Sequence, residues 1–343
     1  MTVTVPVMPR QIVLPQRDYP ISPRENLMLA LNHQKPYWMP DFYGSSQGVR
    51  SKLYREKCPT LDADGVDWFG ARYKYVPAQG GTTPQPGLFE SIDEWEDKVR
   101  FPNFDDRAQF DWEADAAGFK RDPDKALYMR FSNGVFERLH MSEGFEQALI
   151  DLISEPEACK AYFERMVDYK IDLFNHFRDV YPLDYLVYAD DYGTQNGPFF
   201  STELFEKVML EADIRLVKAV QARGTKFVLH SCGKVDAFLP YFIEDMGVDG
   251  LEIQKLNDIA ADLGAYGDRV LISIKPDDQV VYDDQVTDER LTRHIRQLVD
   301  AYGAASNPGP GIALRLRCGT DHGLYLMEDE LYRYSTERYA TFH

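Results

Sequence analysis

One histidine and two cysteines offer the most distinctive chemistry in this sequence. His230 and Cys232 lie in LHSCG, and Cys318 lies in RCGTDHG. Both motifs follow predicted β-strands, where residues two apart point to the same side, so His230 and Cys232 can share a ligand. One nitrogen and two sulfur donors suit Zn(II), and three protein ligands leave a fourth position open. Glu252, at the end of another predicted strand, can fill that position in the resting state. The alternative is that these are unrelated core side chains.

Further polar residues follow other predicted strands. Asp190 and Asp191 come directly after the strand 185–189. Paired acids in such a place can orient a substrate, act as acid or base, or hold a metal, and the alternative is a loop-capping or helix-capping role. We assign catalytic roles to Asp190, Asp191 and Glu252. Glu137 fits an ion pair equally well, and His322 can orient Cys318 or contact a substrate. The residues that we assign to substrate binding are Asn133, Glu137, Tyr192 and His322.

The elements that must position these residues are short strands alternating with helices. Apolar residues spaced by three and four predict a helix over 157–181, and helices also fit 203–223 and 288–302, each followed or closed by a glycine. Strand–helix alternation implies a parallel sheet with right-handed crossovers. No GxGxxG motif follows a strand, so we predict an α/β fold of the (β/α)8 TIM barrel type rather than a dinucleotide-binding sheet. The predicted strands after residue 125 are 126–131, 185–189, 226–229, 250–253, 269–274 and 311–317.

The N-terminal part of the chain has a different texture. Residues 1–21 contain several prolines and no clear periodicity, so we predict an extended arm. Ser22 begins a helix, because Ser-Pro-Arg-Glu combines an N-cap, a proline at the first helical position and a glutamate at the third. We predict one TIM-barrel domain over 22–343, in which 22–125 is an elaboration with little regular structure and 126–343 carries the main strands and helices.

The composition excludes several classes of function. The 343 residues hold 38 Lys and Arg against 56 Asp and Glu, a net charge of −18. A protein this acidic lacks the basic face that binding to nucleic acid or to an anionic membrane requires, and no apolar run is long enough to span a bilayer. The N-terminus lacks the apolar core of a signal peptide, so we expect a cytoplasmic protein. Its four cysteines are then inert, catalytic or metal-bound rather than bridged.

The sequence resembles the uroporphyrinogen decarboxylase superfamily, and within it the cobalamin-linked methyltransferase branch. The resemblance runs from about residue 22 almost to the end. True decarboxylases carry an arginine motif of the RQAGRY type, which KPYWMPDFYGSSQGVRSKLY lacks, and they lack HxCG. ISIKPDD at 272–278 departs from the GGID-like sequence that is common in relatives. The blocks that carry the resemblance include SPRENLMLALNHQKPYWMP, GVDWFGARY, IDEWEDKVRFPNFDD, MSEGFEQALIDLISEPEA, ADDYGTQNGPFFSTELFEK, LHSCGKVDAFLPYFIEDMGVDGLEIQKLNDI and LRCGTDHG.

The resemblance implies a zinc-dependent methyltransferase. His230, Cys232 and Cys318 become the zinc ligands, and the zinc acts as a Lewis acid on the oxygen of an aryl methyl ether. The methyl group passes to the Co(I) of a corrinoid, which a partner protein carries because this chain has no DxHxxG signature. The methyl donor is then a small molecule such as a methoxylated aromatic compound.

Three alternatives stay open at this point. The first is methyl transfer from a methylated corrinoid to the thiol of coenzyme M, for which zinc would activate a thiolate. The second is metal-free decarboxylation of a porphyrinogen. The third is a non-enzymatic protein that binds a corrinoid or holds a structural zinc.

Overall fold

The chain forms two compact units that alternate along the sequence. The structure, a computed structural model, describes residues 17–56, 63–79, 81–303 and 311–341. The first unit comprises Met1–Gln47, Arg121–Tyr128 and Val248–His343, and the second comprises Gly48–Lys120 and Met129–Gly247. Each unit is described by itself. Of the predicted arm over 1–21, residues 1–16 lie outside the described residues.

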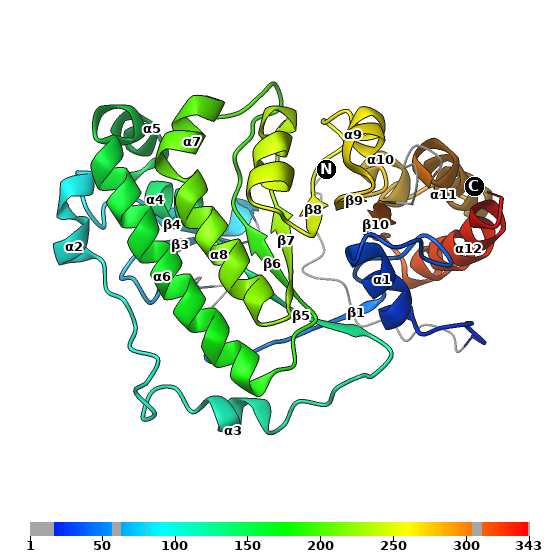
Figure 1. The fold of residues 1–343 in the computed structure, drawn as a ribbon, viewed down its shortest axis with the longest axis horizontal. Helices are drawn as coiled ribbons and strands as arrows, with labels where there is room; N and C mark the ends of the chain where they lie inside the picture. The colour runs from blue at the N-terminus through cyan, green and yellow to red at the C-terminus, as the bar shows by residue number, and fades with distance from the viewer. Residues whose placement is uncertain (1–16, 57–62, 80, 304–310, 342–343) are drawn as a thin grey trace. The chain divides into compact units, whose positions relative to one another are not determined.

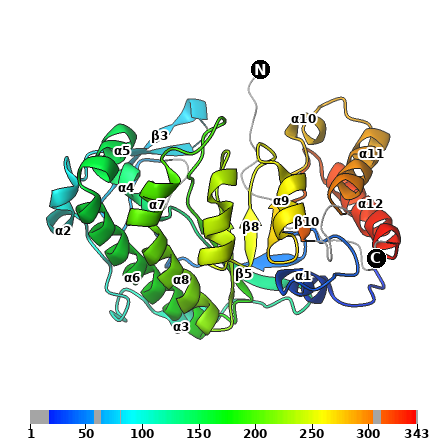
Figure 2. The same ribbon diagram turned by 45° about the horizontal axis from the view of Figure 1, so that its top comes forward.

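Parallel strands form the centre of the second unit. β6 (Tyr185–Ala189) pairs in parallel with β7 (Lys226–His230), so that Ala189 lies opposite His230. β5 (Ala126–Phe131), whose last residues belong to this unit, is the neighbour of β6 on its other side. Every residue of β6 is buried, as expected for a parallel strand that is covered on both faces. α6 (Pro156–Val180) and α8 (Leu210–Ala222) lie side by side beside these strands (Figures 1 and 2).

Parallel strands also form the centre of the first unit. β9 (Leu271–Ile274) lies between β8 (Gly250–Glu252) and β10 (Ile312–Leu314) and pairs in parallel with both. α11 (Asp288–Leu298) packs against α12 (Asp321–Tyr339) in Figure 1. The strands in both units therefore follow one another in the order in which they occur in the chain.

The remaining elements connect and cover these strands. In the first unit they are α1 (Pro23–Leu31), β1 (Ser46–Gly48), whose last residue belongs to the second unit, α9 (Ile259–Tyr266), α10 (Asp278–Val281) and a π-turn over Val299–Gly303. In the second unit they are β2 (Gly65–Val66), β3 (Arg72–Val76), β4 (Gly81–Gln85), α2 (Trp95–Lys98), α3 (Trp112–Ala116), α4 (Val135–Glu143), α5 (Phe145–Ser154) and α7 (Thr202–Val208), with short 3-10 or π turns over Pro77–Gln79, Ile92–Glu94, Asp236–Phe238 and Tyr241–Asp245.

The predicted α/β barrel fold is confirmed. All six strands predicted after residue 125 are present, although β8, β9 and β10 are shorter and β7 is one residue longer than predicted, and helices follow them as the alternation requires. The capping box at the first helix is present too, because the side chain of Ser22 accepts a hydrogen bond from the N–H of Glu25, whose carboxylate accepts from the N–H of Ser22. Sequential parallel strands and crossover helices are the architecture of a TIM barrel.

Two local predictions need correction. Helix 203–223 is divided at Met209 into α7 and α8, because Met209 has φ −119° and bends the chain there. The apolar pattern runs through the bend, so the sequence gives no sign of it. The elaboration over 22–125 also contains more regular structure than predicted, namely the antiparallel sheet β2-β3-β4. The alternation of polar and aromatic residues in Arg-Tyr-Lys-Tyr over 72–75 is the sequence signal of β3, and Tyr73 is the one buried residue of that strand.

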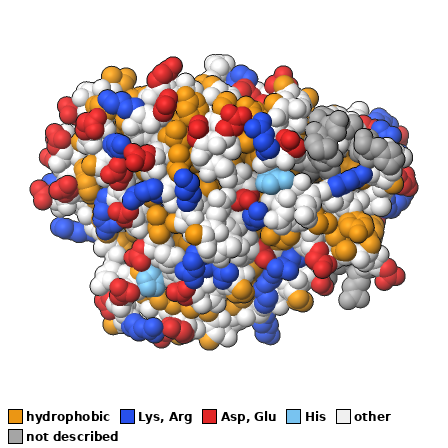
Figure 3. All heavy atoms as spheres, in the orientation of Figure 1, with side chains coloured by type: hydrophobic (Ala, Val, Ile, Leu, Met, Phe, Trp, Pro, Cys, Tyr) orange, Lys and Arg blue, Asp and Glu red, His pale blue; other side chains and the backbone are white. Residues whose placement is uncertain are grey.

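The described surface carries mixed charges. Figure 3 shows acidic and basic side chains interspersed over one face, with hydrophobic side chains between them. Within the described residues, no helix is both long enough and apolar enough to cross a bilayer.

Candidate functional site

The candidate metal ligands lie at the ends of β6 and β7, and hydrogen bonds connect the two segments that follow these strands. The N–H of Asp190 donates to the carbonyl of His230 at 3.0 Å, and the N–H of Tyr192 donates to the hydroxyl of Ser231 at 3.0 Å. Farther on, the N–H of Lys234 donates to the carbonyl of Thr194 at 2.7 Å. The two segments after the strands are therefore tied together along their length, and the side chains between these contacts are held in place.

Two glycines permit this close approach. A Cβ on Gly233 would lie 2.2 Å from the carbonyl carbon of Gly193, and a Cβ on Gly193 would lie 2.8 Å from the backbone nitrogen of Lys234. Gly233 also has φ +84°, in the left-handed region that glycine adopts most readily. Larger residues at either position would push the two segments apart.

Three donor atoms converge beside these glycines. The Sγ of Cys232 lies 3.5 Å from the Nε2 of His230, which in turn lies 3.7 Å from the Oδ1 of Asp191. All three ligand atoms lie within 4.8 Å of one another, and all three residues are partly exposed. The N–H of Cys232 donates to Oδ1 of Asp191 at 2.7 Å and so fixes that carboxylate next to the other donors. A nitrogen, a sulfur and a carboxylate oxygen in partial contact with solvent are a donor set that fits Zn(II).

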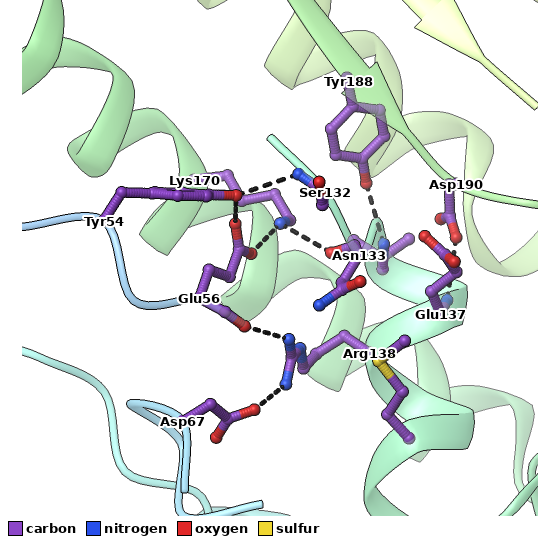
Figure 4. Close-up of polar contacts among 12 residues, drawn as sticks. Tyr54, Glu56, Asp67, Ser132, Asn133, Glu137, Arg138, Lys170, Tyr188 and Asp190 are labelled. Carbon is purple, nitrogen blue, oxygen red and sulfur yellow. Dashed lines mark hydrogen bonds and ion pairs between the residues drawn. The ribbon is translucent and has the colours of Figure 1, made fainter. Parts of the chain in front are cut away.

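Asp190, the neighbour of Asp191, is buried and bound by the protein. Its carboxylate accepts hydrogen bonds from the N–H groups of Phe136 and Glu137, both at 2.9 Å, at the beginning of α4 (Figure 4). The hydroxyl of Tyr192 reaches the carboxylates of both Asp190 and Asp213. Burial, together with the nearby charge of Asp213, raises the pKa of Asp190 to about 7, and burial raises the pKa of Asp213 to about 7. Asp190 therefore holds the N-terminus of α4 against the segment after β6 that carries Asp191.

Asn133 and Glu137 lie on the segment that links β5 to α4. Asn133 is 2% exposed and has φ +62°, which is unusual for a residue other than glycine. Its carbonyl accepts a hydrogen bond from the ammonium of Lys170 at 2.9 Å, and its Nδ2 is buried without a hydrogen-bond partner among the described residues. Glu137 is partly buried, and its backbone N–H is one of the two that bind Asp190.

The sequence prediction missed a network of buried charges next to this segment. Lys170 pairs with Glu56, and Arg138 pairs with Asp67 at 2.6 Å, with all four side chains fully buried (Figure 4). The guanidinium of Arg138 also donates to the carbonyl of Glu56 at 2.6 Å. Lys170 occupies the apolar stripe of α6 between Met166 and Leu173, and a charge inside such a stripe is the sequence pattern that indicates a buried ion pair.

The other predicted site residues belong to the first unit. Glu252 is buried, where its carboxylate accepts a hydrogen bond from the hydroxyl of Tyr43 and lies 3.5 Å from the guanidinium of Arg315. The thiol of Cys318 donates to the carbonyl of Val281 at 3.4 Å. The exposed His322 pairs with Asp288 at 3.0 Å.

The second unit thus brings together most of the predicted site. Its members there are Asn133, Glu137, Asp190, Asp191, Tyr192, His230 and Cys232. Cys318, Glu252 and His322 lie in the first unit, and their place in the site stays a prediction. Of the other two cysteines, Cys159 is buried on α6, and Cys58 lies outside the described residues.

Sequential parallel strands with polar side chains at their carboxyl ends place this protein among the α/β barrels. The model of the family described as uroporphyrinogen decarboxylase (URO-D) matches residues 136–320, which is more than half of the chain. The chain therefore belongs to this family, whose members are enzymes. The matched region begins in α4, includes His230 and Cys232, and ends just after Cys318.

Solved structures show only a distant likeness. One is a glycosylated endo-β-1,4-xylanase of glycoside hydrolase family 10 from Gloeophyllum trabeum, with 12% identity and a TM-score of 0.34 over 56% of this chain and 62% of that chain. Another is a uronate isomerase from Bacillus halodurans, with 9% identity and a TM-score of 0.34 over 69% of this chain and 56% of that one. This chain thus spans less than two thirds of either enzyme. A comparison with curated proteins finds no match.

Proposed function

We propose that this protein is a zinc-dependent methyltransferase that removes a methyl group from an aryl methyl ether and passes it to the Co(I) of a corrinoid protein. The observation that carries the proposal is the convergence of Asp191, His230 and Cys232 at the ends of two adjacent parallel strands. Membership of the uroporphyrinogen decarboxylase family supports an enzyme of this superfamily, and the methyltransferase branch is our proposal within it.

The residues present fit a zinc ion. His230 would supply Nε2, Cys232 would supply Sγ, and Asp191 would supply a carboxylate oxygen. Asp191, one of the paired acids that the sequence offered as metal ligands, joins His230 and Cys232 in this proposal. Cys318 remains the predicted second sulfur ligand. Bound zinc would supply Lewis acidity at the ether oxygen.

The side chains around the donors have separate tasks in this proposal. Breaking the O–CH3 bond leaves a phenolate, which takes up a proton when the product leaves. The N–H of Cys232 orients Asp191, and Asp190 keeps the start of α4 in position beside it. The unpartnered Nδ2 of Asn133 is a donor that a substrate oxygen can accept from.

Metal analysis of purified variants tests the assignment. We expect about one zinc per chain in the parent protein and close to none in Cys232→Ser and His230→Ala, because loss of one ligand removes most of the affinity of a three-ligand or four-ligand site. Cys159→Ser is the matched control, since it removes a thiol on α6 that takes no part in the site, and it should keep the zinc. Cys318→Ser tests the predicted second sulfur ligand in the same assay.

The zinc protein is then supplied with methoxylated aromatic compounds and a reduced corrinoid protein. Formation of methyl-cobalt and the free phenol supports demethylation. A methyl-cobalt protein that loses its methyl group only to coenzyme M would instead favour the thiol methyltransferase. A folded parent protein that contains no zinc, after preparation without chelators, would contradict the proposal and favour a metal-free decarboxylase.

A further inference from the structure

An aromatic-walled pocket lies in the second unit, apart from the residues of the candidate metal site. Its volume is about 370 Å³, within the usual range for small-molecule sites. The rings of Trp68, Phe101 and Phe110 form its walls, and Leu53 adds aliphatic surface. None of these residues is a predicted ligand, catalytic residue or substrate contact. All of them come from the N-terminal elaboration rather than from the strand ends.

Packing behind the pocket fixes the positions of these rings. Phe110 is 5% exposed, stacks on Trp112 at a centroid distance of 5.5 Å, and meets the edge of Trp68 at 5.9 Å. The guanidinium of Arg165 lies 3.9 Å from the ring of Phe101. The side chains of the walls are thus fixed before a ligand binds. Binding of a flat ring would therefore cost little entropy for ordering these side chains.

A cation lies among the pocket-lining residues. Arg55 is exposed, and within the described residues no carboxylate pairs with its guanidinium. Asp106, an acid bound to the lining residue Gln109, accepts hydrogen bonds from that side chain at 2.5 Å and from the N–H of Ala108 at 3.0 Å. In a chain with a net charge of −18, an unpaired guanidinium beside an aromatic pocket favours an anionic ligand.

We propose that this pocket binds a single-ring aromatic carboxylate. The ring lies against Trp68 and Phe110, where offset or edge contacts between aromatic rings are favourable. The carboxylate pairs with Arg55, whose planar guanidinium can donate two parallel hydrogen bonds. Neither contact involves a candidate zinc ligand, so this proposal stands independently of the proposed methyltransferase activity.

Binding of benzoate, measured by calorimetry on the full chain, tests the pocket. We expect a dissociation constant below about 1 mM, a value consistent with a ligand of this size. Benzamide, which lacks the charge, and cyclohexanecarboxylate, which lacks the flat ring, should each bind at least about tenfold more weakly. Weaker binding of both analogues is required, because a simple anion site would accept cyclohexanecarboxylate and a simple apolar pocket would accept benzamide.

Variants locate the site. Arg55→Gln should weaken benzoate binding at least about tenfold, because the charge-assisted pair is lost. The matched control is Arg72→Gln, which removes another exposed guanidinium of the same unit that does not line the pocket and should leave the affinity unchanged. Trp68→Phe should remove the change in tryptophan fluorescence that benzoate produces in the parent.

Cys232→Ser separates this proposal from the previous one. Benzoate binding that persists in this variant supports a separate pocket, whether or not the protein holds zinc. Binding that disappears in Cys232→Ser, or that Arg55→Gln leaves intact, places benzoate elsewhere and overturns the proposal. An absence of binding at about 10 mM benzoate, far above the expected dissociation constant, overturns it too.

Discussion

Gly233 allows the two chain segments that carry the metal-donor atoms to approach each other closely. A Cβ at this position would lie 2.2 Å from backbone atoms of Gly193, which cannot rotate away as a side chain can. We expect Gly233→Ala to lower the free energy of unfolding by about 2–4 kcal/mol, because crowding adds to the cost of φ +84°. It should also lower the zinc content, since Cys232 precedes the displaced residue. Urea denaturation and metal analysis measure the two effects.

Gly247→Ala is the matched control for that substitution. Gly247 has φ +70°, similar to Gly233, but a Cβ there would meet no atom within 4 Å. Only backbone strain remains, so we expect a loss of about 1 kcal/mol and no change in zinc content. Equal losses for the two variants would contradict the idea that contact with Gly193 makes Gly233 indispensable.

Residue types alone predicted part of the candidate site. The HxC spacing correctly indicated that His230 and Cys232 lie next to each other, because that inference needs only the geometry of one strand. Asp191 was expected as a catalytic acid, yet its placement beside the other donors depends on pairing between two strands about 40 residues apart, as the hydrogen bond from Cys232 shows. Asp190 took the capping position that the sequence offered as an alternative.

Two helices anchor the segment around Glu56 and Asp67 through buried ion pairs, and this anchoring can be tested on α6. Lys170→Met leaves the Glu56 carboxylate buried without its cation. We expect this variant to lose about 3–5 kcal/mol of unfolding free energy, because desolvation of an unpaired charge is costly. The double variant Lys170→Met, Glu56→Gln should recover much of that loss, since position 56 then carries no unpaired buried charge. Urea denaturation gives all three values.

An exposed pair on the same helix provides the control. Arg215 donates to Asp168 of α6 at 2.8 Å, and both side chains are about half exposed. Arg215→Met should change the free energy of unfolding by less than about 1 kcal/mol. If Lys170→Met costs no more than Arg215→Met, the buried pair does not anchor the segment.

At the scale of elements, periodicity located the helices well and their interruptions poorly. The stripe of Tyr162, Met166 and Leu173 predicted α6 to within a residue at each end, since burial of one face shapes a long helix. The bend at Met209 escaped prediction because the apolar pattern runs through it, and the hairpin β3–β4 escaped because only β3 alternates, whereas β4, with the sequence GTTPQ, does not. Buried charges such as Lys170 were visible in the stripe, but their partners come from distant parts of the sequence.

Three buried carboxyl groups, Glu143, Asp213 and Glu328, have pKa values shifted in the same direction. Burial raises the pKa of Glu143 to about 8, with a further contribution from Asp151, and that of Glu328 to about 8, with a further contribution from Asp41. Burial also raises the pKa of Asp213 to about 7. These groups keep their protons in the folded protein at pH values where the unfolded chain has lost them, so the folded state binds more protons. Stability must then fall as the pH rises through this range.

Melting temperatures between pH 6.5 and 9 test this sign. We expect a decrease that is steepest near pH 6.5 and levels off above about pH 8, because the folded state binds more protons than the unfolded chain only until these buried carboxyls ionise near pH 7–8. Glu143→Gln should already be more stable than the parent at pH 6.5, where unfolded Glu143 has lost its proton, and its advantage should grow up to about pH 8 and so flatten the curve. Glu146→Gln, an exposed substitution on the neighbouring helix, should follow the parent throughout.

Mutual repulsion in a chain of net charge −18 also lowers stability as the pH rises, but this effect weakens with salt. The difference between Glu143→Gln and the parent should therefore persist at high ionic strength, and its disappearance there would refute the contribution from burial.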